Sequence, residues 1–126
     1  MKERIVSTRV LIVDDAKFMR HMIKGILVEM GWEVVGEAAD GREATRKYKE
    51  LSPDIVTMDI VMPEMSGIEA LKEIREADAD AKVVMISAID QREPLMEALK
   101  LGAVDYIVKP FEKDRVTEAM QRVVAG

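Results

Sequence analysis

The chain has 126 residues, of which 48% are hydrophobic, and this suits a single domain with a buried core that we expect to span residues 1–126. It contains no cysteine, which excludes disulfides and thiolate metal sites and fits a cytoplasmic location. The formal net charge of −5 and the lack of a basic stripe argue against a nucleic-acid-binding protein. No signal peptide is recognisable, and no segment reaches the roughly 18 apolar residues that insertion across a membrane requires.

Strand-like and helix-like segments alternate along the chain. Apolar runs rich in β-branched residues predict strands at 10–13, 33–38, 55–58, 82–86 and 106–108. Helical spacing of apolar residues predicts helices at 16–30, 41–51, 66–77, 91–101 and 112–124. The strands are continuous apolar runs, which is typical of parallel strands buried on both faces. The expected fold is therefore an α/β domain with a five-stranded, doubly wound parallel sheet and helices on both faces.

Polar residues follow four of these predicted strands. They are Asp14 and Asp15 after the first strand, Asp59 after the third, Ser87 after the fourth and Lys109 after the fifth. In an open α/β sheet, ligands bind in the crevice beyond the carboxyl ends of the strands. We therefore expect three acids, a hydroxyl and an ammonium group to meet at one edge of the sheet.

These residue types suit a metal ion and a phosphoryl group. Three crowded carboxylates repel one another, and a hard divalent cation relieves this repulsion. Mg²⁺ is the expected ion and Mn²⁺ its alternative, because both bind carboxylate oxygens. A carboxylate can also attack phosphorus to give an acyl phosphate, with Lys109 and Ser87 stabilising the phosphoryl oxygens. Taken singly, each residue has a plainer interpretation as a helix cap, a turn former or a solvated lysine.

Four motifs in order make the chain similar to a known family. They are Val10–Asp15, Asp59–Gly67, Ser87–Ala88 and Lys109–Phe111. Together with five βα units they resemble the response-regulator receiver domain, and most closely its stand-alone chemotaxis members, from about Arg9 to Val124. The resemblance implies a flavodoxin-like (βα)₅ fold, a single receiver domain without an output domain, and phosphorelay signalling rather than enzymatic turnover of a substrate.

The resemblance also implies roles for individual residues. Asp59 is then the phospho-acceptor, and Mg²⁺ is held by Asp14, Asp15, Asp59 and the main-chain carbonyl of Val61. Lys109 contacts the phosphoryl group, and its peptide bond to the following proline is expected to be cis.

Two further residues are implied to transmit the signal. Ser87 matches the switch hydroxyl, and Tyr106 matches an aromatic switch that turns inward after phosphorylation. The implied partners are a histidine kinase as phosphodonor, a flagellar motor switch protein or its adaptor, and a phosphatase. The expected resting state is a monomer. A phosphate sink, or a phosphorelay outside motility, remains an alternative.

Two rival interpretations use the same acids differently. A phosphohydrolase of the haloacid-dehalogenase type needs an acid two residues after its aspartate nucleophile, where this chain has Val61. A binding module that is never phosphorylated would be marked by a missing acid or lysine, and none is missing.

Val61 and Ile89 are both apolar and cannot orient an attacking water, so we expect slow self-dephosphorylation. His21, the single histidine, is interpreted as a surface residue.

Overall fold

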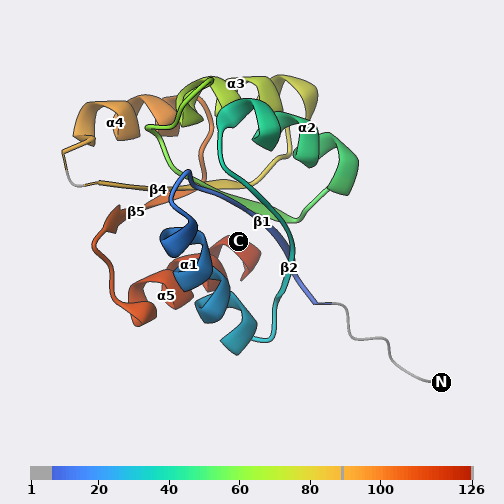
Figure 1. Cartoon of the computed structure of the whole chain (residues 1–126), viewed down its shortest axis with the longest axis vertical. Coiled ribbons are helices and arrows are strands. Elements are labelled where there is room, and N and C mark those ends of the chain that lie inside the picture. Colours follow the sequence, from blue (N-terminus) through green and yellow to red (C-terminus); the bar gives the residue numbers. More distant parts are fainter. Residues whose placement is uncertain (1–6, 89, 126) are drawn as a thin grey trace.

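The computed structural model describes residues 7–88 and 90–125, which form one sheet and its covering helices. The elements in chain order are β1 (Arg9–Val13), α1 (Lys17–Glu29), β2 (Glu33–Ala38), α2 (Gly41–Leu51), β3 (Ile55–Met58), α3 (Gly67–Ala77), β4 (Val83–Ala88), α4 (Arg92–Lys100), β5 (Asp105–Lys109) and α5 (Lys113–Ala125). Figure 1 shows α1 and α5 on one face of the sheet and α2, α3 and α4 on the other. Within the described residues, no helix is long and apolar enough to cross a membrane.

All neighbouring strands are parallel, and their order is β2-β1-β3-β4-β5. The chain moves from β1 to one edge of the sheet and then returns past β1 to build the other half. The strand order therefore reverses between β1 and β3, and this is the point at which such sheets bind ligands. The predicted doubly wound, five-stranded parallel sheet is confirmed.

The core lies in two layers, one on each face of the sheet. Alternate residues of β1 serve the two layers: Leu11 and Val13 pack towards α2, α3 and α4, whereas Val10 and Ile12 pack towards α1 and α5. Because both faces are covered, the central strands need apolar residues at most positions, as the sequence has them. This packing holds the carboxyl ends of β1 and β3 rigidly side by side.

Strand β4 is longer than predicted. It continues through Ala88, and Ser87 pairs with Val108 of β5, so Ser87 lies inside the strand rather than after it. Strand β5 likewise includes Lys109, which pairs with Ala88. Backbone groups make the ladder of hydrogen bonds, so a polar side chain does not end the strand when the neighbouring strand continues. Both side chains stay at the carboxyl edge of the sheet.

Candidate functional site

The three predicted acids come together at the carboxyl edge of β1 and β3. One carboxylate oxygen each from Asp14, Asp15 and Asp59 lies within 4.8 Å of the others. Asp14 and Asp59 are buried, with exposures of 1% and 7%, whereas Asp15 is exposed. Hard oxygen donors at this spacing, with one side open to solvent, fit a divalent cation that keeps some of its waters.

The backbone fixes both buried aspartates. The Asp14 N–H donates to the Ala38 carbonyl at 3.0 Å, and the Asp59 N–H donates to the Val13 carbonyl at 3.0 Å. One oxygen of each carboxylate is also held locally: Asp14 Oδ1 accepts the Ala16 N–H at 2.9 Å, and Asp59 Oδ1 accepts the Ile60 N–H at 2.8 Å. Within residues 7–88 and 90–125, the Oδ2 atom of each aspartate accepts no such backbone N–H.

Lys109 connects these two carboxylates across the sheet. Its Nζ lies 2.7 Å from Asp14 Oδ2 and 3.5 Å from Asp59 Oδ2. The side chain is only 18% exposed, so its charge acts in a partly dry environment. The Lys109–Pro110 peptide bond is cis, as the resemblance implied. The last residue of β5 thus brings a positive charge to the predicted phospho-acceptor.

Burial raises the pKa of the Asp59 carboxyl above its ordinary value, and the negative charge of Asp14 raises it further. The Lys109 ammonium and the Ile60 N–H act in the opposite direction, but they do not cancel the effect of burial. The ionised form of Asp59 is therefore poorly stabilised by the protein alone. A cation or an electrophilic phosphorus next to this carboxylate would stabilise its negative charge.

Ser87 supplies a hydroxyl with unused hydrogen-bonding capacity. Its side chain is fully buried, and its Oγ has no hydrogen-bond partner among the described residues. Strand β4 lies between the strands that lead to Asp59 and Lys109. Buried hydroxyls without partners are uncommon in folded proteins because they lose their hydration, so this one calls for an explanation.

Gly67 is a site residue whose role was not predicted from the sequence. Its N–H donates to the Ile60 carbonyl at 2.8 Å, and a Cβ atom at this position would lie 1.8 Å from the Asp59 carbonyl oxygen. The start of α3 therefore packs directly against the backbone of the predicted phospho-acceptor. Ser66 holds this helix start through a capping box with Glu69. The signals in the sequence were the glycine that follows a capping serine and its place at the end of the Asp59–Gly67 motif.

Two predictions on the neighbouring loops stay untested. Val61 is 60% exposed, as expected for a residue at the open side of the site, and its carbonyl stays a predicted metal ligand. Ile89, the second residue of the predicted slow-hydrolysis pair, lies outside the described residues. His21 is exposed on α1, in agreement with its interpretation as a surface residue.

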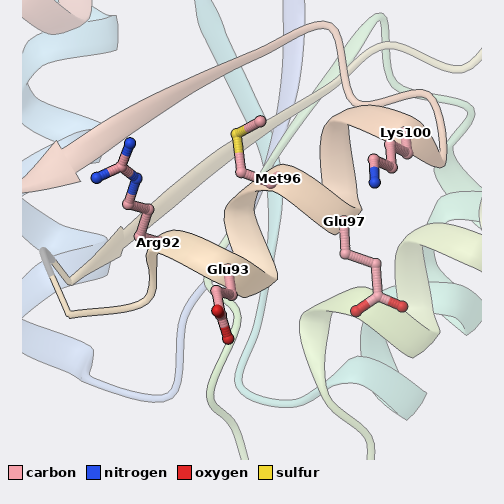
Figure 2. Close-up of a pocket in the computed structure, with 5 residues that line it drawn as sticks. All are labelled: Arg92, Glu93, Met96, Glu97 and Lys100. Carbon is pink, nitrogen blue, oxygen red and sulfur yellow. The ribbon is translucent and has the colours of Figure 1, made fainter.

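Tyr106 lies away from the acids, where β5 meets α4. It is 38% exposed and lines a hollow together with Arg92, Leu95, Met96, Leu99 and Val108. A second hollow runs along α4 itself, and Figure 2 shows its lining residues, with Glu93 and Glu97 on one side of the helix and Arg92 and Met96 on the other. Neither hollow contains a predicted metal or phosphoryl ligand. The predicted metal and phosphoryl ligands thus lie at the strand ends, whereas Tyr106 lines a separate hollow.

Comparison with known proteins agrees with this geometry. Residues 10–121 match the family described as Response regulator receiver domain. The chain is 60% identical over 118 residues to the chemotaxis protein CheY of Thermotoga maritima, and 59% identical over 119 residues to that of Bacillus subtilis. These matches cover 94% of this chain and 98% and 99% of the two relatives.

A solved structure is similar over nearly the same span. A chain of the CheX–CheY–BeF₃–Mg²⁺ complex from Borrelia burgdorferi matches with a TM-score of 0.89 and 40% identity, covering 93% of this chain and 89% of that chain. Fold, acidic cluster and relatives therefore agree, and the chain belongs to the response regulator receiver domain family.

Proposed function

We propose that this chain is a phosphorylation-dependent response regulator that accepts a phosphoryl group on Asp59 and signals in chemotaxis. One observation carries the proposal: the Asp59 carboxylate lies within reach of two further acids and of the Lys109 ammonium. The relatives named CheY support the pathway, since they match almost the whole chain. As a receiver it is a signalling protein rather than an enzyme.

The phosphodonor in this proposal is the phosphohistidine of a histidine kinase. A carboxylate oxygen of ionised Asp59 attacks phosphorus, the phosphorus–nitrogen bond breaks, and the imidazole leaves with the electron pair and takes up a proton. Lys109 stabilises the negative charge on the phosphoryl oxygens. The unpartnered Ser87 hydroxyl donates to one of them, which accounts for its otherwise costly burial.

A divalent cation completes the site in this proposal. Asp14, Asp15, Asp59 and the carbonyl of Val61 would hold Mg²⁺, and Mn²⁺ is the alternative ion. The cation supplies neutralisation of charge on the phosphoryl oxygens. The hard oxygen donors support this assignment, and so does the magnesium named in the complex of the Borrelia relative.

In this proposal the signal leaves through a surface of the receiver domain that a partner protein binds. Ser87 moves towards the phosphoryl group, and Tyr106 moves into the hollow between β5 and α4. The changed surface then binds a flagellar motor switch protein or its adaptor. A protein of the CheX type is a further partner, since the Borrelia relative forms a complex with CheX. We further propose a cytoplasmic, monomeric resting form.

The test uses beryllofluoride, which mimics a phosphoryl group on a carboxylate. Backbone amide NMR spectra of the wild type are recorded with Mg²⁺ before and after its addition, and the same is done for Asp59→Asn. We expect shifts around Asp59, Ser87 and Tyr106 in the wild type and none in the variant. Equal shifts in both proteins, or none in the wild type, would contradict the proposal. Tryptophan fluorescence would report this binding poorly, because Trp32 precedes β2, at the end of the sheet opposite the acids.

A further inference from the structure

Arg20 on α1 donates a hydrogen bond to the loop that carries two of the three acids. Its Nη1 donates to the main-chain carbonyl of Asp14 at 2.7 Å, and its Nε donates to Glu37 Oε1 at 2.9 Å. The side chain is only 16% exposed, although arginine is usually a surface residue. Glu37 belongs to β2, so Arg20 links α1, the loop after β1 and the edge strand of the sheet.

The Asp14 carbonyl that accepts this hydrogen bond belongs to the peptide unit that joins Asp14 to Asp15. The orientation of that peptide plane helps to set the direction in which the Asp15 side chain leaves the backbone. No described residue makes a hydrogen bond or an ion pair with the exposed Asp15 carboxylate, whereas the Asp14 carboxylate is held by Ala16 and Lys109. The contact from Arg20 is therefore the one side-chain restraint on this peptide among the described residues.

We propose that Arg20 is a positioning residue for the cation site, which it serves by fixing the Asp14–Asp15 peptide while Glu37 holds its guanidinium. This inference rests on the proposed function, because it assumes that the acids bind Mg²⁺. Substitution of groups that orient metal ligands without touching the metal commonly lowers the affinity of the site for its metal about ten- to a hundredfold.

A purely electrostatic role for Arg20 predicts the opposite sign. A positive charge near the acids repels a divalent cation, so its removal would tighten binding. If Arg20 positions Asp15, its removal weakens binding instead. The direction of the change therefore separates the two roles. A matched control is Lys24 on the same helix, whose Nζ is 4.0 Å from Glu37 Oε2 and which makes no contact with Asp14 among the described residues.

The experiment measures Mg²⁺ affinity by isothermal titration calorimetry for the wild type, Arg20→Met, Arg20→Lys and Lys24→Met. We expect Arg20→Met to bind Mg²⁺ about tenfold more weakly. Arg20→Lys should recover part of this loss, because an ammonium can donate to one of the two acceptors but not to both. Lys24→Met should bind as the wild type does or slightly more tightly. The amide resonance of Asp15 should shift in Arg20→Met and stay in place in Lys24→Met.

Each result bears on the inference in a defined way. Unchanged or tighter binding by Arg20→Met would overturn it while leaving the proposed function intact. A wild type that does not bind Mg²⁺ would overturn both. If Arg20→Met does not fold, as judged by its thermal melt, Arg20→Lys decides: binding about threefold weaker than the wild type supports the inference, and equal binding overturns it.

Discussion

Gly67 packs directly against the backbone of Asp59, and this makes Gly67→Ala a strong test. A Cβ atom built at this position lies 1.8 Å from the Asp59 carbonyl oxygen, whereas real Cβ atoms essentially never come within 3.0 Å of another heavy atom. The loop after β3 and the start of α3 must therefore move apart by more than 1 Å, on the order of the displacement that impairs catalytic sites. The movement also strains the bond from the Gly67 N–H to the Ile60 carbonyl.

Two contributions set the size of the effect. Overpacking of a closely packed region costs about 1–3 kcal/mol, and the loss of one buried hydrogen bond costs about 1 kcal/mol more. We therefore expect Gly67→Ala to lower the free energy of unfolding by about 2–4 kcal/mol. Because the moving atoms belong to Asp59, we also expect it to accept a phosphoryl group about a hundredfold more slowly.

The assay combines urea unfolding with the rate of phosphorylation by acetyl phosphate in the presence of Mg²⁺. Gly25→Ala is the matched control, because a Cβ at Gly25 in α1 meets nothing within 4 Å. This control should be more stable by about 0.5–1 kcal/mol, as alanine has the higher helix propensity, with an unchanged phosphorylation rate. A Gly67→Ala protein with the stability and rate of the wild type would refute the reasoning.

Three more predictions follow from buried or exposed side chains at or near the strand ends. Thr57 is buried in β3, and its Oγ1 has no partner among the described residues, so Thr57→Val should raise the free energy of unfolding by about 1 kcal/mol in urea titrations. Because the pKa of the Asp59 carboxyl is raised in the folded state, the unfolded state loses the Asp59 proton first as pH rises past the ordinary value near 3.8. Stability from this group therefore falls as pH rises. With chelator present, Asp59→Asn should melt above the wild type by a margin that grows as pH rises above about 4, and a margin that does not change with pH would argue against this prediction. Val61→Asn should shorten the lifetime of the acyl phosphate, followed by loss of the phosphate mass, since its amide can orient water where the exposed valine cannot.

Features that depend on short sequence patterns could be predicted. Continuous apolar runs reveal the strands, and the three acids, Ser87 and Lys109 were predicted from their places at strand ends. The roles of Val61 and Tyr106 were implied only by the family resemblance. Ser87 was predicted to follow the fourth strand but lies inside it, because parallel pairing with Val108 extends β4 beyond its apolar run. The pattern of apolar side chains shows which residues are buried, whereas hydrogen bonds between backbone groups decide where a strand ends.

Features that depend on contacts between distant segments could not be predicted. Gly67 is required by its approach to Asp59, and Arg20 of α1 is held by Glu37 of β2. The unpartnered hydroxyl of Thr57 appears only when the neighbouring strands are in place. Nothing in the local sequence distinguishes these residues from an ordinary helix start, a surface arginine or a β-branched strand residue.

In the proposed function, Asp59 accepts a phosphoryl group with the help of the neighbouring acids and Lys109. The most direct measurement is intact mass spectrometry after incubation with acetyl phosphate and Mg²⁺, followed by peptide mapping, for the wild type and Asp59→Asn. We expect one phosphate adduct on the peptide that contains Asp59, and we expect it to be lost in the variant and on removal of divalent cations. No adduct in the wild type, or an adduct that persists in Asp59→Asn, would contradict it.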